Sequence, residues 1–327
     1  MSIPYSTHHY AFHGLAFQIR SNDASVLAAL QRRLRHFRIL REPLAELCFV
    51  LERVSQESDL PITKPPGPLR PVYDLKMGEV VYSATADQLY IRYGDNVRCV
   101  CDPEKGRTHI AFRPYREQEV WLVSHPLFTL PLLELCKRHQ RYSLHAAGLC
   151  LQNKGILLPG TSGAGKSTLT LALLRAGFDF LGDDQIFLSQ DSGGIRMLAF
   201  PDEVDITEET AGFFPELTSQ RRCRRPVGWP KHPLLVEEVY DVKFVRECRP
   251  AVVVFPQISA KQASLLKRMS PGEALLELAP NILLTERCSC QSHLDILAEL
   301  VRTTPCYRLE TGRDFDTTPR LLADLVA

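Results

Sequence analysis

The sequence lacks an excess of charge of either sign, long apolar runs and a dense set of cysteines. Lys and Arg together number 39 against 38 Asp and Glu, so no overall field would hold a nucleic acid or an anionic membrane. The longest apolar stretches, such as 251–255, are far shorter than the ~20 residues that cross a bilayer. Ten cysteines in 327 residues are too few for a disulfide scaffold.

The first residues also lack the basic stretch and apolar run of a secretory signal. We therefore expect a cytoplasmic protein that does not enter a membrane. We do not expect nucleic acid as its main partner, and any such contact would have to be local. The composition, with 45% hydrophobic and 24% charged residues, is typical of a folded protein with a sizeable core. A length of 327 residues indicates roughly two domains.

Residues 1–140 are predicted to form a smaller α+β domain dominated by antiparallel strands, which would serve substrate choice or assembly. Helical periodicity predicts an amphipathic helix over 23–40 with a solvated basic face, and a second helix over 126–139. Ser21, Asn22 and Asp23 each offer an N-cap oxygen to the first of these helices. Strands are expected at 12–19, 80–82, 89–93 and 109–112. The sequence leaves the oligomeric state open, and a homo-oligomer is compatible with it.

The most informative segment contains a phosphate-binding loop pattern. Residues 160–167 read GTSGAGKS, which matches GxxxxGKS. Glycines in such a loop let backbone N–H groups turn inward around a polyphosphate, and the following helix adds the positive end of its dipole. The apolar run 156–158 predicts a strand before the loop, and 167–176 predicts a helix after it, so the context agrees with the motif.

The pattern assigns a role to each part of the loop. Lys166 would reach the β- and γ-phosphates, and Ser167 would offer a hydroxyl group to Mg²⁺. The residues predicted to bind the polyphosphate are Gly160, Thr161, Ser162, Gly163, Ala164, Gly165, Lys166, Ser167 and Thr168.

Two aspartates follow the next predicted strand, 178–181. In an open α/β sheet, residues at the carboxyl end of a strand next to the loop's own strand face the ligand crevice. Of Asp183 and Asp184, one could accept the proton of a hydroxyl group while the other holds Mg²⁺. Adjacent side chains on an extended chain point to opposite faces, which predicts unequal roles. A turn or helix-capping pair is the alternative.

The segment around these residues resembles the catalytic domain of HPr kinase/phosphorylase-like serine kinases. In that family a histidine precedes the loop's first glycine by fifteen residues, and two aspartates follow that glycine by 23 and 24 residues. His145, Asp183 and Asp184 stand at these offsets from Gly160. The resemblance implies that 141–327 is an α/β P-loop kinase domain of the HPr kinase/phosphoenolpyruvate carboxykinase type.

The resemblance also implies an activity and its participants. ATP and Mg²⁺ would be the cofactors, and a serine hydroxyl on a protein or peptide would be the acceptor. Asp184 would be the base, His145 would lie beside the acidic pair, and Asp183 would contribute to the metal site. Glu203, within the acidic segment 200–214, is the candidate for a second metal ligand. That segment lacks the Gly-rich signature of bifunctional members, so the resemblance does not extend to the reverse, phosphorylase reaction.

Other interpretations stay open. The chain could be a small-molecule kinase of the shikimate or nucleotide kinase type, which also has an acidic strand end after its loop, or a regulatory module that binds nucleotide without turnover. A family arginine would fall at Pro250, which leaves Arg246 or Arg249 as candidates. The basic segment 221–231, RRCRRPVGWPK, could hold an acidic peptide or a nucleic acid, pair with its acidic flanks, or be solvated.

Overall fold

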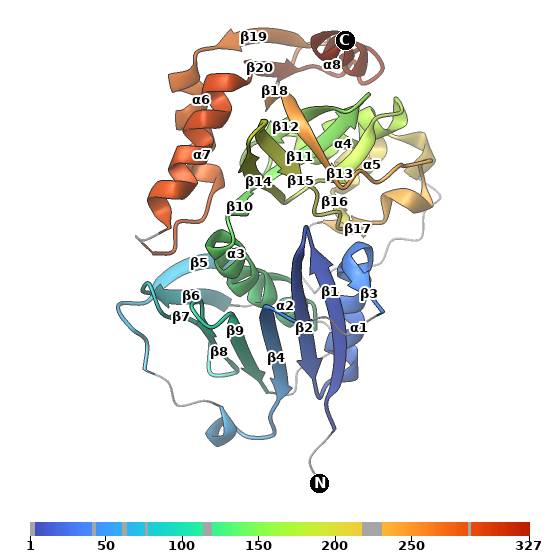
Figure 1. Cartoon of the computed structure of the whole chain (residues 1–327). Helices are drawn as coiled ribbons and strands as arrows, with labels where there is room; N and C mark the ends of the chain where they lie inside the picture. The colour runs from blue at the N-terminus through green and yellow to red at the C-terminus, as the bar shows by residue number, and fades with distance from the viewer. Residues whose placement is uncertain are drawn as a thin grey trace. The chain divides into compact units, whose positions relative to one another are not determined.

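The structure, a computed structural model, describes residues 4–40, 44–60, 64–75, 78–113, 120–217, 231–286 and 289–327 (Figure 1). It is a mixed α/β protein with large sheets, and it divides into two compact units. The first unit contains the described residues up to His139 and those of the segment 284–290, whereas the second contains the described remainder from Gln140 onward. None of the described helices is long and apolar enough to span a membrane.

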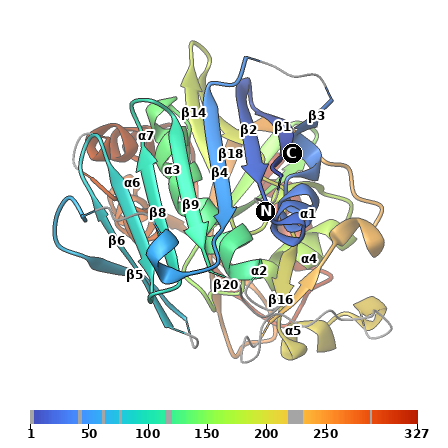
Figure 2. The ribbon, with the colours of Figure 1, turned by 90° about the horizontal axis from the view of Figure 1, so that it is seen from below.

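The first unit is built on one mixed sheet, with strands in the order β3-β1-β2-β4-β9-β8-β7-β6-β5 (Figure 2). The strands are β1 (Ser6–Phe12), β2 (Leu15–Ser21), β3 (Arg38–Ile39), β4 (Leu47–Arg53), β5 (Arg70–Leu75), β6 (Gly78–Ala84), β7 (Leu89–Tyr93), β8 (Val97–Asp102) and β9 (Arg107–Phe112). The helices are α1 (Ala24–Arg33), α2 (Val120–Leu122) and α3 (Phe128–Arg138). Neighbouring strands are antiparallel except that β4 runs parallel to both β2 and β9.

A row of aromatic rings joins this sheet to α3. Tyr10 on β1, Phe17 on β2, Phe49 on β4 and Phe128 on α3 follow one another, with ring centroids 5.2, 5.8 and 4.9 Å apart. All four side chains are buried. Large aromatic side chains remove much apolar surface from water, so this row forms the centre of the unit's core.

Two local expectations for the first unit were wrong. The expected strand over 12–19 is a hairpin, because His13 and Gly14 adopt φ angles of 47° and 83° between β1 and β2. Two consecutive residues with positive φ are typical of the tight turns that match the twist of paired strands. The expected helix over 23–40 is also shorter: Asp23 caps α1 as predicted, but the chain joins the sheet as β3 after Arg33.

The basic face of α1 is not wholly solvated. Arg33 is only 8% exposed, and its guanidinium donates to the carbonyl of Ser124 at 2.9 Å and to the hydroxyl of Thr129 at 2.8 Å. A buried guanidinium requires such acceptors. This contact joins α1 to the helical segment that ends in α3.

A buried ion pair fastens the segment 284–286 to α3. Lys137 Nζ lies 2.8 Å from Glu134 Oε2, and their side chains are 2% and 1% exposed. Lys137 also donates to Thr285 Oγ1 at 2.6 Å, and the Thr285 hydroxyl donates to Glu134. Nearby, Arg138 pairs with Glu286 at 3.4 Å. Removal of one member would leave a buried charge without compensation.

The second unit has its own sheet, with strands in the order β10-β14-β15-β18-β12-β11-β13 and with β20 and β19 beyond β18. The strands are β10 (Tyr142–Leu144), β11 (Ala146–Leu151), β12 (Lys154–Pro159), β13 (Asp179–Gly182), β14 (Ile186–Asp191), β15 (Gly194–Leu198), β18 (Glu247–Ile258), β19 (Leu265–Met269) and β20 (Cys306–Thr311). A separate small pair consists of β16 (Val204–Ile206) and β17 (His232–Leu234). The helices are α4 (Lys166–Arg175), α5 (Glu208–Gly212), α6 (Pro271–Leu278), α7 (Cys290–Thr303) and α8 (Thr318–Val326).

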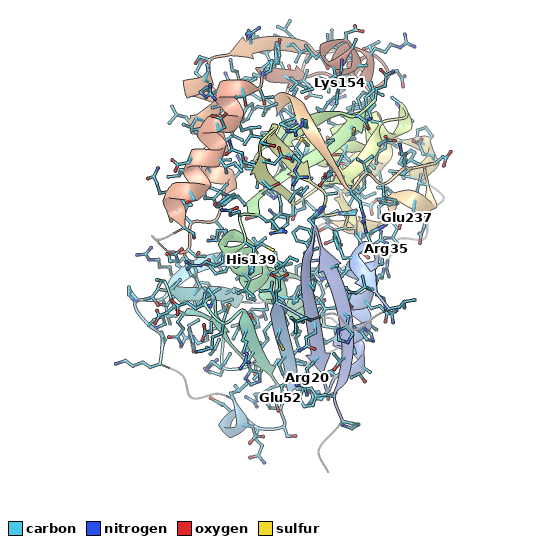
Figure 3. The ribbon with its side chains drawn as sticks, viewed as in Figure 1. Arg20, Arg35, Glu52, His139, Lys154 and Glu237 are labelled. Atoms are coloured by element: carbon cyan, nitrogen blue, oxygen red, sulfur yellow. The ribbon has the colours of Figure 1, made fainter. Side chains whose placement is uncertain are left out.

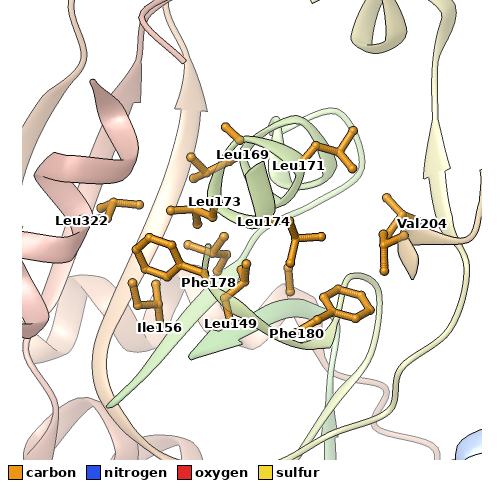
Figure 4. Packing of buried hydrophobic residues seen from close by; sticks show 14 of the residues in the cluster. Leu149, Ile156, Leu169, Leu171, Leu173, Leu174, Phe178, Phe180, Val204 and Leu322 are labelled. Carbon is orange, nitrogen blue, oxygen red and sulfur yellow. The ribbon is translucent and has the colours of Figure 1, made fainter. Parts of the chain in front are cut away.

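Two buried clusters cover the faces of this second sheet. Alternation along β12 sends Ile156 and Leu158 to one face, where they meet the leucines of α4 and α8 (Figure 4). Leu157 points to the other face, where α6 and α7 pack. At the start of the same strand, Lys154 donates to the carbonyl of the terminal residue Ala327 at 2.8 Å (Figure 3). Strand β12 is therefore held on both faces, as the anchor of the loop that follows it.

Gly155 provides a test of this packing. A Cβ atom there would lie 2.8 Å from the Arg249 carbonyl oxygen, Cys248 Sγ and Met197 Sδ. We expect Gly155→Ala to lower the free energy of unfolding by about 1–3 kcal/mol, because one of these contacts is backbone and cannot rotate away. Urea denaturation measures the change. Gly272→Ala is the control, because a Cβ there meets nothing within 4 Å. It should be at least as stable as the wild type, since alanine favours the helix α6 more than glycine does. Equal stability of both variants would contradict the packing argument.

Candidate active site between β12 and α4

Three segments meet at the carboxyl end of β12. The antiparallel register of β11 pairs Ala146 with Pro159, which brings His145 level with the loop that follows β12. Strand β13 pairs antiparallel with the other edge of β11, so it runs in the same direction as β12. Asp183 and Asp184, which follow β13, therefore reach the same end of the sheet as the loop.

The position of β13 corrects one expectation from the sequence. The aspartates were expected after the strand next to the loop's own strand, but β11 lies between β13 and β12. The neighbours of β12 are β11 and the parallel strand β18. The register with β11, rather than direct pairing with β12, brings the acidic pair to the loop.

The loop leads into a helix whose first turn is open to an anion. Gly163 and Gly165 have φ angles of 87° and 96°, a left-handed conformation that glycine adopts without strain. Gly165 is the N-cap of α4, no side chain caps the helix, and its first turn contains no acidic residue. Thr161, Ser162 and Gly163 are exposed. The free N–H groups and the positive end of the helix dipole are suited to a phosphate.

Lys166, the first residue of α4, is buried with all three of its N–H donors in use. Its Nζ donates to the carbonyl of Gly160, to the carbonyl of Thr161 at 3.2 Å and to His145 Nε2 at 3.0 Å. Burial lowers the pKa of the Lys166 ammonium group, and the charges of Asp183 and Asp184 oppose that shift. The ammonium group therefore lies directly beneath the loop.

The hydrogen bonds of His145 fix its tautomer. Its Nδ1 lies 2.9 Å from the carbonyl oxygen of Asp184 and 3.1 Å from Asp184 Oδ1, and both of these atoms accept. Nδ1 must therefore carry the hydrogen, and Nε2 is left to accept from Lys166. His145 thus links the ammonium group of Lys166 to the carboxylate of Asp184.

Asp184 combines an exposed carboxylate with a strongly lowered pKa. Desolvation by surrounding protein raises its pKa, but the hydrogen bond from His145 and the positive charges of Lys166 and Lys231 oppose this, and the net effect lowers the pKa to about 2. The side chain is nevertheless 75% exposed. The group is consequently ionised at neutral pH and can be reached by a substrate.

Asp183 has the opposite environment, in agreement with the expected inequality of the pair. It is 5% exposed, and its two oxygens accept from Ser167 Oγ at 2.7 Å and Thr170 Oγ1 at 2.6 Å. Burial raises its pKa, although the two hydroxyl donors oppose the shift. Sequence reasoning missed Thr170, although its position three residues after Ser167 predicts that both hydroxyls share one face of α4.

The donor set fits a hard divalent cation such as Mg²⁺. Ser167 gives its hydroxyl hydrogen to Asp183, which leaves the oxygen lone pairs available to a metal ion. Within the described ranges, no group of three or more His, Cys, Asp and Glu side chains is arranged to hold a metal. A cation here would therefore also need phosphate and water oxygens, as is usual for Mg²⁺. Glu203 lies between β15 and β16, and its role as a ligand stays a prediction.

Other residues named from the sequence lie elsewhere. The Thr168 hydroxyl is 3.0 Å from that of Thr210 on α5. Arg249 is level with Lys154, at the end of β12 opposite the loop, and bonds Asp191 at 3.1 Å, so it does not reach the site. The basic segment 221–231 lies outside the described residues apart from Lys231, which is half-buried.

Comparisons with known proteins add little to this geometry. No protein-family model matches the chain, and no curated protein matches its sequence. A solved structure that is similar is the Hpr(Ser) kinase/phosphatase from Coxiella burnetii, with 16% sequence identity and a TM-score of 0.33. The match covers 56% of this chain and 87% of that chain. A score this low does not establish a common fold.

The environment of Asp183 predicts a gain in stability when its charge is removed. Because its pKa in the folded state lies above the reference value of 3.8, the folded protein loses stability as the pH rises through the folded-state pKa. Asp183→Asn should therefore be at least as stable as the wild type at pH 7, with the difference vanishing below about pH 4. Thermal unfolding across pH 4 to 8 measures this.

Asp183→Ala removes the hydrogen-bond acceptor as well as the charge, so its comparison with Asp183→Asn separates the effects of these two features on stability. It leaves the hydroxyls of Ser167 and Thr170 without their acceptor and should be less stable than the wild type at every pH. If Asp183→Asn were instead clearly less stable than the wild type at pH 7, the argument that burial disfavours the carboxylate would be wrong.

Proposed function

We propose that this chain is an ATP-dependent, Mg²⁺-requiring kinase that transfers the γ-phosphoryl group to a serine hydroxyl on a protein or peptide. The observation that carries the proposal is the hydrogen-bonded series Lys166–His145–Asp184 beside the uncapped start of α4. The series provides the ammonium group of Lys166 for phosphate oxygens. On the other side of the His145 ring it provides the exposed carboxylate of Asp184 for an acceptor hydroxyl. Phosphoryl transfer requires these two features at adjacent positions.

The loop and α4 would bind the polyphosphate. Lys166 would exchange its bonds to the carbonyls of Gly160 and Thr161 for bonds to phosphate oxygens, and the N–H groups of the first helical turn would complete the cradle. Ser167 and Asp183 would hold Mg²⁺, which supplies neutralisation of phosphate charge. The buried bonds from Ser167 and Thr170 keep Asp183 in one orientation.

Asp184 would orient the acceptor hydroxyl and take its proton. A carboxylate with a pKa of about 2 is a weak base, so its main contribution is position and negative charge. That is sufficient for a loose phosphoryl-transfer transition state, in which positioning and electrostatics dominate. His145 would act as a positioning residue, because it holds both Asp184 and Lys166.

The acceptor class comes from the resemblance noted in the sequence. A serine-bearing protein or peptide, a cytoplasmic location and a role for the first unit in substrate choice or assembly are all parts of the proposal. The basic segment 221–231 would recruit an acidic partner. A homo-oligomer is compatible with this activity and is not required by it.

Transfer of label from γ-labelled ATP tests the proposal. Incubation with Mg²⁺ and a desalted lysate of the source organism should label a discrete protein or peptide at serine. Lys166→Ala and Asp184→Asn should each lower the rate by about 10²-fold or more, because one removes the phosphate cation and the other the base. Asp184→Asn should still bind ATP. Lys154→Ala, a lysine at the opposite end of β12, is the matched control and should label as the wild type does.

Other outcomes identify the alternatives. Label in a metabolite rather than a macromolecule would indicate a small-molecule kinase. ATP binding without transfer to any component would favour a regulatory module. Equal labelling by the wild type and both site variants would show that the activity does not belong to this chain.

A further inference from the structure

A large apolar side chain lies exposed beside the loop. Strand β18 runs parallel to β12 and ends at Ile258. Val252 and Val254 on this strand pack in the cluster that contains α4, and alternation places Ile258 on the same face, beyond the start of that helix. Ile258 is 67% exposed, and its Cγ1 lies 3.3 Å from the Cβ position built on Gly165. The side chain therefore lies beside the last residue of the loop and offers much of its surface to solvent.

The chain after Ile258 is firmly held. Ser259 donates its N–H to the carbonyl of Thr311 at 3.0 Å. Ser264 Oγ accepts from the N–H of Gly312 at 3.0 Å and donates to Asp314 at 2.6 Å. These bonds tie one end of the turn between β18 and β19 to the last residue of β20, and the other end to the segment that follows β20. The exposed position of Ile258 is thus fixed by the fold.

The sheet order gives the loop two distinct sides. His145 and Asp184 come from β11 and from the end of β13, on one side of β12, whereas Ile258 comes from β18 on the other side. If the γ-phosphate of a bound nucleotide lies beside Asp184, the rest of the polyphosphate would extend past Gly165 toward β18. We propose, on the basis of the kinase function above, that Ile258 is the platform on which the nucleoside part of the bound nucleotide packs.

The chemistry of a nucleoside suits this position. A purine ring has a flat, weakly hydrated face that packs well on an aliphatic side chain, and burial of that surface favours binding. Contact with the Ile258 side chain would favour binding of a nucleotide over binding of a bare polyphosphate, because only the nucleotide has a base that can pack on this side chain. Ile258 would therefore contribute to nucleotide affinity and take no part in phosphate binding.

Comparison of MgATP with magnesium tripolyphosphate tests this assignment. By isothermal titration calorimetry, Ile258→Ala should weaken ATP binding by about three- to tenfold and change tripolyphosphate binding by less than about twofold. Ile258→Val should retain most of the ATP affinity. Leu276→Ala, which truncates a 76% exposed leucine on α6, should change neither affinity. Thermal unfolding confirms that the variants are folded.

The outcomes distinguish this inference from the kinase proposal. Unchanged ATP affinity in Ile258→Ala, or an equal loss for both ligands, overturns the platform and leaves the phosphate-binding loop in place. Wild-type protein that binds neither ligand overturns the proposed function and this inference with it. If Ile258→Ala weakens the binding of ATP and leaves the binding of tripolyphosphate unchanged, the result supports both the proposed role of Ile258 and nucleotide binding by this site.

Discussion

The hydrogen-bond register of β11 decides which side chains meet at the loop. This strand pairs antiparallel with β12 on one edge and with β13 on the other, so the bend at His145, the start of the loop and the end of β13 all fall at one end of the sheet. A one-residue shift in either pairing would turn every side chain of the shifted strand to the opposite face. Buried contacts on both faces of the sheet make such a shift unfavourable.

Within that frame, the two aspartates differ because their surroundings differ. Asp183 is enclosed by α4 and receives two hydroxyl donors, whereas Asp184 is exposed and is held by an imidazole beside an ammonium group. The same residue type is thereby given a raised pKa at one position and a lowered pKa at the next. Environment, rather than residue type, makes one carboxylate buried and hydrogen-bonded and leaves its neighbour exposed.

The sequence was sufficient for features that depend on short stretches of chain. It predicted the strand before the loop, the helix after it, and an N-cap among residues 21–23, which the structure places at Asp23. It also predicted that Asp183 and Asp184 would point in different directions, and their burial differs accordingly. It failed where the answer depends on distant pairing. That β11 intervenes between β12 and β13 is a property of sheet order, which local periodicity does not encode.

Similar limits apply to single residues. The hairpin turn at His13 and Gly14 was missed because this pair is not one of the Asn-Gly, Asp-Gly or Gly-Gly pairs that indicate a two-residue hairpin turn most strongly. The exposure of Ile258 was also invisible, since an apolar residue at the end of an apolar strand is ordinarily expected in the core. Residue type alone therefore did not reveal the conformation of His13 or the exposure of Ile258.

The ion pair on α3 has a consequence for how the protein is made. Thr285, which bonds both Lys137 and Glu134, follows Lys137 by 148 residues. During synthesis, the first unit must wait for most of the second to leave the ribosome before its buried charges are fully satisfied. A fragment that ends near residue 140 would lack Thr285 permanently. The first unit begins the chain, but it cannot form all of its buried contacts until residue 285 has been synthesised.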